Sequence, residues 1–528
     1  MTARTIRNPI LTGFNPDPSI CRAGDDFFIA TSTFEWFPGV QIHHSKDLVN
    51  WRLLTRPLTC ASQLDMIGNP DSCGIWAPCL SYADGLFWLV YTDVKTRSAT
   101  FMSLHNYLVT APDITGPWSE PVYLNASGFD PSLFHDEDGR KWIVNMLNDY
   151  RVGKGRFEGI LLQEYSVAEK RLVGPIKNIF KGTELGATEG PHLYRHDGTY
   201  YLMTAEGGTG YNHAVTMARS KHIEGPYKVD PMNPMLTSRD TGARLQKAGH
   251  ASFVELDDGS VYLVHLCGRP VWHRDRRYCI LGRETAIQKC CWSDDGWLRL
   301  ADGGNTPQDD VPAPELPTSE FEPPPGREEF DRPELPLAFQ SLRVPVGEEW
   351  ASLKARPGHL RLIGREGTVS RHHQSLLARR IKSFHCEAAT CVEFQPESFH
   401  QMAGLIALYD VKTQFYLAVT HDEALGRCVK LIMLDKGRYS EPAGAGVAVR
   451  GAERVFLKVA MRRHTMRFAW SLGGKEWHEI GPALQATLLS DEYCGGFTGA
   501  FVGICCQDLN GSRLHADFDW FEYRDLEE

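Results

Sequence analysis

The sequence predicts an all-β protein in which a five-bladed β-propeller is followed by a C-terminal β-sandwich. Two patterns point to this fold class. A hairpin phrase recurs five times in the first 300 residues, and the last 192 residues show strand-like alternation without a long amphipathic helix. The composition agrees, because 48 Gly, 31 Pro and 11% aromatic residues in a chain of 528 favour many short strands joined by turns.

The recurring phrase consists of a turn residue, one spacer and a run of mostly apolar or aromatic residues. Its copies start 60, 54, 59 and 61 residues apart, at Asp25, Gly85, Gly139, Gly198 and Gly259. Asp precedes the Gly in four copies, and an Asp-Gly pair between apolar runs is a strong hairpin signal. Five such units, each rich in short strands, predict five four-stranded blades around one axis.

The propeller is expected to span residues 1–310. Residues 311–336 are crowded with Pro, Asp and Glu, and this composition predicts an extended linker. Residues 337–528 include alternating segments such as 456–462 and 465–471. They predict a β-sandwich of jelly-roll, lectin-like type.

The charge, the hydrophobic pattern and the cysteines of the chain argue against several classes of protein. The chain has 56 basic and 66 acidic residues, a net charge of −10, which argues against nucleic-acid binding. No stretch approaches the 18 apolar residues of a membrane span. The first ten residues lack the apolar core of a secretion signal, and the 14 cysteines contain no CxxC pair. We therefore expect a cytoplasmic protein with free thiols.

Eight or nine residues before each hairpin phrase stands a residue that could reach the propeller axis. These residues are Asp17, Trp76, Asp130, Glu189 and His250. Each lies at the start of a largely apolar strand, so all five side chains would converge if these strands are innermost in their blades. Three carboxyl groups, an imidazole and an indole make an unusual core, because buried carboxylates are costly unless they are paired or functional.

Opposed carboxyl groups beside an aromatic platform are typical of glycoside hydrolysis. One carboxylic acid protonates the leaving oxygen, and the other attacks the anomeric carbon or deprotonates water. A third carboxylate nearby raises the pKa of the acid by like-charge repulsion. Taken singly, Asp17 and Asp130 could instead cap Asp-Pro-Ser turns, and Trp76 and His250 could be core residues. The sequence contains no HExxH, GxSxG or P-loop motif, which argues against peptidase, serine hydrolase and nucleotide-binding functions.

At these positions the sequence resembles glycoside hydrolase family 43, specifically its two-domain branch of β-xylosidases and α-L-arabinofuranosidases. The resemblance covers nearly the whole chain. It is carried by residues 13–20, 32–48, 74–78, 128–134, 187–194, 249–252, 281–285 and 495–503.

The resemblance implies an inverting, exo-acting glycosidase that releases D-xylose from the non-reducing ends of β-1,4-xylo-oligosaccharides, with α-L-arabinofuranosidase side activity. By motif match, Asp17 is the general base that activates water and Glu189 is the general acid. Asp130 modulates the pKa of the acid and orients it. In an inverting site the base and the acid are expected to lie about 6.5–9.5 Å apart.

The same resemblance implies the walls of the sugar site. Arg283 would bind sugar hydroxyls, while Phe34 and Trp76 would wall the terminal-sugar subsite. A loop of the sandwich that carries Phe497 or Phe501 is expected to close the active site.

No cofactor is expected to be required for the chemistry. Propellers that resemble this one often hold calcium near the axis, and His250 would be its neighbour through water. His250 is also expected to contact the substrate. The expected partners are xylo-oligosaccharides and arabinosylated xylo-oligosaccharides, with no nucleic acid and no membrane, and a homo-oligomer is left open.

Two alternatives remain open from the residues. The chain could act mainly as an α-L-arabinofuranosidase, which the same three carboxyl groups would serve. It could also be a non-catalytic carbohydrate-binding propeller with a lectin-like sandwich. A binding protein needs aromatic and hydrogen-bonding side chains but no acid–base pair.

Overall fold

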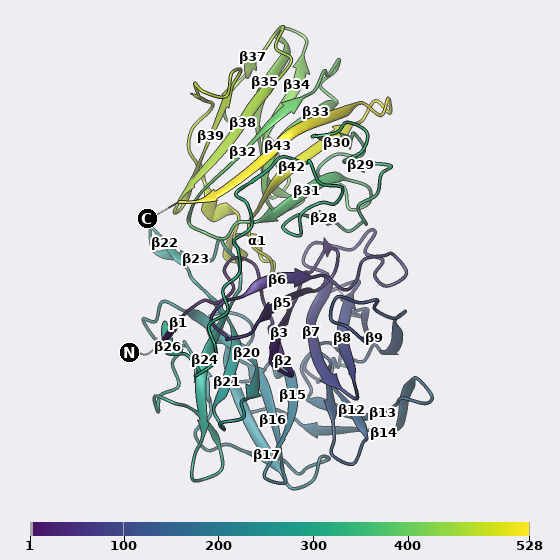
Figure 1. The fold of residues 1–528 in the computed structure, drawn as a ribbon, viewed down its shortest axis with the longest axis vertical. Coiled ribbons are helices and arrows are strands. Elements are labelled where there is room, and N and C mark those ends of the chain that lie inside the picture. The colour runs from purple at the N-terminus through teal and green to yellow at the C-terminus, as the bar shows by residue number, and fades with distance from the viewer. Residues whose placement is uncertain (1–3, 99, 527–528) are drawn as a thin grey trace.

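The computed structural model describes residues 4–98 and 100–526, which form two β-sheet domains stacked end to end (Figure 1). The N-terminal domain is a ring of five sheets, and the C-terminal domain is a two-layer sandwich. The predicted fold class is confirmed. Every described element is a strand except the 3-10 turn η1 (Ala486–Leu488) and the short helix α1 (Asp491–Cys494). Among the described residues, no helix has the length and apolar character needed to cross a bilayer.

Each blade is an antiparallel sheet made from consecutive strands. Blade 1 contains β2 (Ser19–Ala23), β3 (Asp26–Thr31), β5 (Gln41–Ser45) and β6 (Arg52–Thr55). Blade 2 contains β7 (Gly74–Ala83), β8 (Leu86–Val94), β9 (Leu104–Ala111) and β10 (Val122–Asn125). Blade 3 contains β11 (Ser132–His135), β12 (Lys141–Met146), β13 (Ile160–Ser166) and β14 (Arg171–Phe180).

The last two blades carry additional strands. Blade 4 contains β15 (Glu189–His196), β16 (Thr199–Glu206), β17 (Ala214–Ser220) and β18 (Lys228–Val229), and β19 (Leu236–Thr237) also pairs with β17. Blade 5 contains β20 (Gln246–Glu255), β21 (Val261–Gly268), β24 (Glu284–Trp292) and β25 (Leu298–Leu300). Between β21 and β24 lies a separate hairpin of β22 (Val271–His273) and β23 (Arg276–Tyr278).

The recurring phrase joins the first two strands of each blade. In blade 2, for example, Asp84 and Gly85 adopt φ values of 56° and 74°, and positive φ at both positions is the geometry of a type I′ hairpin turn. Apolar side chains fill the spaces between blades. One cluster joins Ile20 and Ile29 of blade 1 to Val264 of blade 5, and it closes the ring. Outside the blades, β1 (Thr5–Arg7) pairs with β26 (Asp310–Pro312).

The sandwich consists of two nine-stranded sheets. One sheet contains β27 (Arg327–Glu328), β29 (Ala351–Ser352), β30 (Leu360–Ile363), β32 (His385–Glu393), β38 (Val455–Arg462), β39 (Thr465–Ser471), β40 (His478–Glu479), β41 (Leu484–Gln485) and β43 (His515–Asp525). The other contains β4 (Trp36–Phe37), β28 (Gln340–Leu342), β31 (Ser375–Arg380), β33 (Gln401–Asp410), β34 (Thr413–Asp422), β35 (Gly426–Asp435), β36 (Arg438–Ser440), β37 (Val447–Ala448) and β42 (Phe501–Asp508).

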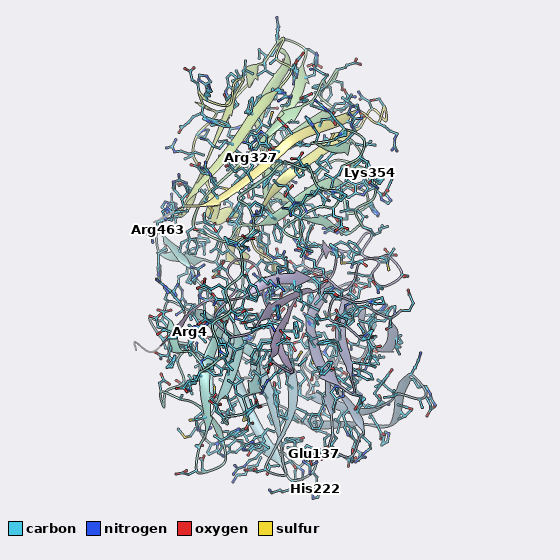
Figure 2. The ribbon with its side chains drawn as sticks, viewed as in Figure 1. Arg4, Glu137, His222, Arg327, Lys354 and Arg463 are labelled. Atoms are coloured by element: carbon cyan, nitrogen blue, oxygen red, sulfur yellow. The ribbon has the colours of Figure 1, made fainter. Side chains whose placement is uncertain are left out.

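One strand joins the two domains directly. β4 comes from blade 1 of the propeller but pairs with β28 at the edge of a sandwich sheet. The Pro-rich segment also packs against both domains, because β27 pairs with β43 and the Phe321 ring lies 4.6 Å from the Arg52 guanidinium of blade 1. Figure 2 places Glu137 and His222 at the propeller end farthest from the sandwich. The opposite end of the propeller therefore lies against the sandwich.

Candidate active site

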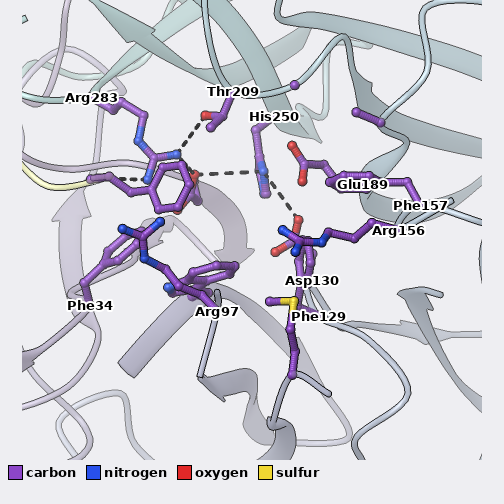
Figure 3. A pocket seen from close by; sticks show the side chains of 16 residues that line it. Phe34, Arg97, Phe129, Asp130, Arg156, Phe157, Glu189, Thr209, His250 and Arg283 are labelled. Atoms are coloured by element: carbon purple, nitrogen blue, oxygen red, sulfur yellow. Dashed lines mark hydrogen bonds and ion pairs between the residues drawn. The ribbon is translucent and has the colours of Figure 1, made fainter. Parts of the chain in front are cut away.

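A cavity of about 280 Å³ lies where the propeller axis meets a loop of the sandwich, and Figure 3 shows its lining. Its lining includes all three predicted carboxyl residues and five of the six predicted substrate-binding residues. Those lining residues are Asp17, Phe34, Trp76, Asp130, Glu189, His250, Arg283 and Phe497. The structure therefore brings together side chains from all five blades and from the second domain.

Near the start of the innermost strand of each blade, a residue that lines the axis or directly follows one adopts a positive φ. The φ values are 54° at Asp17, 36° at Ala77, 54° at Asp130, 55° at Gly190 and 47° at His250. Positive φ strains residues other than glycine, and such strained positions cluster at functional sites.

The five predicted axis residues all line the cavity, but two of them do not occupy the left-handed position. Trp76 and Glu189 stand one residue before the left-handed step, which Ala77 and Gly190 occupy instead. A register shift accompanies each case, between Trp76 and Cys79 and between Glu189 and His192.

Both carboxylate oxygens of Asp17 are held by donors. The Ser32 hydroxyl donates to Oδ2 at 2.7 Å, and Nη1 of Arg283 donates to Oδ1 at 3.0 Å. Arg283 is itself fixed, because Nη1 also donates to Thr209 Oγ1 at 2.9 Å and Nη2 donates to the Phe497 carbonyl at 3.0 Å. These contacts stabilise negative charge on Asp17 and hold its orientation.

Glu189 projects into the same cavity (Figure 3). Burial, followed by the negative charge of Asp17 and opposed by Arg283, raises the pKa of Glu189 to about 8. A carboxyl group with this pKa is mainly protonated at neutral pH. It can therefore serve as a proton donor where Asp17 serves as a proton acceptor.

Asp130 is held beside Glu189 through the backbone. Its Oδ2 accepts the N–H of Gly190 at 3.0 Å. Burial, followed by the charges of Glu189 and Asp17, raises the pKa of Asp130 well above its ordinary value. Because the charges of Asp130 and Glu189 act on each other, Asp130 influences Glu189 through charge as well as through its hydrogen bond to the Gly190 N–H.

His250 lies between the two aspartates. Its Nδ1 is 4.0 Å from Asp17 Oδ1 and 4.0 Å from Asp130 Oδ2. Burial lowers the pKa of His250, so the imidazole is neutral at pH 7. A side chain at Gly190 would place its Cβ 3.0 Å from the His250 ring, which explains why glycine follows Glu189.

Three aromatic rings form one wall of the cavity. The Phe34 ring centroid lies 5.8 Å from that of Trp76 and 6.3 Å from that of Phe497, and Trp76 and Phe497 are 5.7 Å apart. Phe34 is held by paired backbone hydrogen bonds with Ile75, at 3.0 and 3.1 Å. Aromatic faces of this kind pack against the C–H groups of sugar rings.

The loop at residues 495–500 carries Phe497 from the sandwich to the cavity. Ser72 Oγ of blade 2 accepts the Phe497 N–H at 3.0 Å, while Arg283 of blade 5 binds its carbonyl. The loop reaches this position because its backbone passes close to the propeller. A Cβ on Gly499 would lie only 2.6 Å from the Leu281 carbonyl oxygen.

Phe501 does not line the cavity. It is fully buried, and its ring stacks on Trp36 with a centroid distance of 3.9 Å. It lies at the start of β42, so its neighbours are sheet residues rather than the cavity. Of the two predicted sandwich phenylalanines, Phe497 is the one at the site.

Several lining residues escaped the sequence prediction. They are Arg97, Met102, Phe129, Arg156, Phe157, Ala187, Gly208 and Thr209. A signal existed for two of them. Phe129 directly precedes Asp130, and Thr209 lies in the glycine-rich turn at 207–210 after β16. Arg97 lies in the loop between β8 and β9 of blade 2, and Phe157 lies in the loop between β12 and β13 of blade 3, both outside the repeated phrase.

The residues around His250 do not form a directly bound calcium site. Within residues 4–98 and 100–526, no group of three or more His, Cys, Asp or Glu side chains is arranged to hold a metal ion. Calcium takes six to eight oxygen ligands. The nearby oxygens of Asp17 and Asp130 already accept hydrogen bonds from Ser32, Arg283 and Gly190. The predicted calcium ion held near His250 through water stays a prediction.

Comparisons with known proteins agree with this geometry. Residues 6–298 match the model of glycosyl hydrolases family 43, and residues 327–524 match the beta xylosidase C-terminal concanavalin A-like domain. The chain is 52% identical to a beta-xylosidase of Bacillus subtilis, over 98% of this chain and 99% of that protein. It is 51% identical to a xylosidase/arabinosidase of Humicola insolens, over 99% of this chain and 98% of that protein.

A solved structure extends the similarity to three dimensions. The crystal structure of a xylan beta-1,4-xylosidase from Bacillus halodurans C-125 superposes with a TM-score of 0.97 at 56% identity, and it covers 98% of this chain and 100% of that one. The family resemblance carried by the sequence motifs is confirmed, and the non-catalytic alternative is not supported. The chain belongs to glycosyl hydrolases family 43.

Proposed function

We propose that this protein is an inverting, exo-acting β-xylosidase. It releases D-xylose from the non-reducing ends of β-1,4-xylo-oligosaccharides and has α-L-arabinofuranosidase activity as a side reaction. One observation carries the proposal. A buried Glu189 with its pKa raised to about 8 shares a cavity with Asp17, whose two oxygens are both held by donors.

The proposed reaction is a single displacement. Asp17 removes a proton from a water molecule, and the water oxygen attacks the anomeric carbon from the face opposite to the leaving group. As the glycosidic C–O bond breaks, Glu189 gives its proton to the departing oxygen. Asp130 holds the Gly190 N–H and thereby keeps Glu189 in place. The β-glycoside yields α-xylose, and no covalent intermediate forms.

The position of the sandwich loop supports release of single sugars from chain ends. The Phe497 backbone connects Ser72 of blade 2 to Arg283 of blade 5, so the loop bridges one side of the cavity. Arg97 adds to this side, because its guanidinium lies 4.9 Å from the Phe497 ring. Because this side of the cavity is closed, a polysaccharide cannot lie across it. Only the end of the chain can enter the cavity.

The relative turnover of xylobiose, 4-nitrophenyl β-D-xyloside and 4-nitrophenyl α-L-arabinofuranoside tests the proposal. We expect the protein to release xylose from xylobiose and to turn over the nitrophenyl xyloside faster than the nitrophenyl arabinofuranoside. Turnover of the arabinoside alone would favour the arabinofuranosidase alternative, and no release of xylose from xylobiose would overturn the proposal.

Variants connect the activity to the site. Asp17→Asn and Glu189→Gln should each lower turnover of xylobiose by about 10²–10⁴-fold. The matched control is Glu137→Gln, a substitution of the same chemistry at an exposed residue on the far end of the propeller (Figure 2). It should leave turnover unchanged.

A further inference from the structure

A second cluster of basic side chains lies between the propeller and the sandwich. We call His43, Arg56, Arg379 and Arg380 the interdomain cation cluster. His43 lies in β5, Arg56 follows β6, and the two other arginines end β31, so both domains contribute (Figure 1). Together with Asn15, Gln41 and others, these side chains line a cavity of about 40 Å³, and the exposed Lys382 stands at its edge.

The cluster contains positive charge without a partner carboxylate. Among the described residues, no ion pair within 4.0 Å joins Arg56, Arg379, Arg380 or Lys382 to an Asp or Glu. Asp525 attracts Arg379 and Lys382 from a greater distance. The other buried arginines between the domains differ, because Arg343 pairs with Asp71 at 2.8 Å and Arg283 with Asp17 at 3.0 Å.

Without a counter-charge, the burial of these cations is energetically unfavourable. Arg56 and Arg380 are only 5% and 4% exposed. Burial lowers the pKa of Arg56 to about 9, and burial together with the charge of Arg56 lowers the pKa of Arg380 well below its usual range. His43 is also buried, and burial followed by the charges of Lys382, Arg380 and Arg56 lowers its pKa. Unpaired buried charges of this kind call for a counter-charge.

Several nitrogen atoms of the cluster have no hydrogen-bond partner among the described residues. In Arg56, Nη1 donates to the Phe339 carbonyl at 3.3 Å and Nη2 to Gln41 Oε1 at 2.8 Å, but Nε is unpartnered. In Arg380, Nε donates to the Phe14 carbonyl and Nη1 to Gln340 Oε1, but Nη2 is unpartnered.

Nε of Arg379 is also buried without a partner among the described residues. His43 differs, because its ring forms a hydrogen bond with the Ile29 backbone. The three unpartnered nitrogens therefore come from three arginines that line one small cavity. Each buried unsatisfied polar group in a native structure requires an explanation, and an ion is one of the standard ones.

We propose that the interdomain cation cluster binds a monatomic halide, with chloride as the natural ligand. The size fits, because a cavity of 40 Å³ has room for about three water molecules. The donor pattern also fits. Planar carboxylates and tetrahedral phosphates are recognised by guanidinium forks. Arg56 and Arg380 each use two of their five N–H donors on Gln41, Phe339, Phe14 and Gln340, so the remaining donors come from several side chains rather than from one fork, an arrangement that suits a spherical ion.

A bound halide would join the two domains near the active site. Arg380 holds the carbonyl of Phe14, and Gln41 donates to Asn15 Oδ1 at 2.8 Å, so the cluster braces the segment that leads to Asp17. The ion would offset the charge of Arg56 and Arg380 and stabilise this contact between propeller and sandwich. This inference does not depend on the proposed glycosidase reaction, and either can fail without the other.

Crystals of the full chain grown or soaked in sodium bromide test the site directly. Bromide replaces chloride and is located by its anomalous scattering. We expect an anomalous peak bounded by Arg56, Arg379 and Arg380. Water alone at this position, with bromide found elsewhere on the protein, would overturn the proposal.

Thermal unfolding in solution gives a second test with purified full-length protein. At constant ionic strength, replacing sodium gluconate by sodium chloride should raise the Tm of the wild type along a saturating curve, by about 2 °C or more. Arg380→Met should abolish this dependence, and Arg379→Gln, at a half-buried position, serves if Arg380→Met does not fold. The matched control Arg438→Met, at an exposed arginine of β36, should keep it.

Two results would contradict the proposal that the cluster binds a halide. Equal Tm values in chloride and gluconate would show that no halide binds the folded protein. A larger stabilisation by sodium phosphate than by chloride, lost in Arg380→Met, would assign the cluster to an oxyanion instead.

Discussion

The substitution Glu189→Gln changes the one group that the proposed reaction requires in its protonated form. Glutamine keeps the size of the side chain but cannot give up a proton. Burial and Asp17 raise the pKa of Glu189 to about 8. At pH 7 a group with that pKa is protonated in about nine of ten molecules, whereas a carboxyl with a pKa of about 4.3 is protonated in about two of a thousand.

The expected loss therefore depends on the leaving group. Xylobiose has a sugar alkoxide as leaving group, which needs a proton, so its turnover should fall by about 10²–10⁴-fold. Turnover of 4-nitrophenyl β-D-xyloside should fall much less, because the nitrophenolate leaves without a proton. Steady-state kinetics on both substrates measure this difference.

The pH profile provides the second readout. In the wild type, kcat/KM for xylobiose should fall on the alkaline side with a midpoint near the pKa of about 8, since Glu189 loses its proton there. In Glu189→Gln this alkaline limb should be absent. Equal losses on both substrates, or an alkaline limb that persists in the variant, would refute the assignment of Glu189 as the acid.

Further predictions concern the sandwich loop and a buried glutamate. Phe497→Ala should raise KM for xylobiose by about tenfold while Tm stays near that of the wild type, because the lost contact is with the substrate. Phe501→Ala should instead destabilise the protein by about 3–5 kcal/mol, because it removes a fully buried ring, and the opposite pattern in kinetics and unfolding would contradict the placement of the two rings. Burial raises the pKa of Glu35 from 4.5 to about 7. The folded state then binds more protons between these values, so the free energy of unfolding should fall by up to about 3 kcal/mol as pH rises through this window. Urea unfolding at pH 5 and pH 7 should show a smaller fall in Glu35→Gln than in the wild type, and an equal fall would contradict the prediction.

The blades could be predicted from the sequence because their signal is local. The hairpin turns, such as Asp84–Gly85, require residues that accept positive φ, and an Asp-Gly pair recurs in four of the five blades. The three carboxyl residues could be predicted for the same reason, since each stands eight or nine residues before a hairpin phrase. The exact position of the left-handed step was not visible, because the register shifts that place Ala77 and Gly190 there depend on pairing between strands.

Features that arise between distant segments could not be predicted. β4 joins a sandwich sheet through pairing with residues about 300 positions away. Phe497 and Phe501 lie four residues apart in one motif, and only packing separates the ring at the cavity from the ring stacked on Trp36. The interdomain cation cluster combines His43 and Arg56 with Arg379 and Arg380, and no sequence pattern links these positions.

The stereochemistry of hydrolysis tests the central claim most directly. Proton NMR during the first minutes of xylobiose cleavage distinguishes the two anomers of the released xylose before mutarotation mixes them. Direct attack of water activated by Asp17, with Glu189 as the acid, predicts that α-xylose appears first. Initial release of β-xylose would show that a side chain attacks the anomeric carbon, and it would contradict the inverting mechanism.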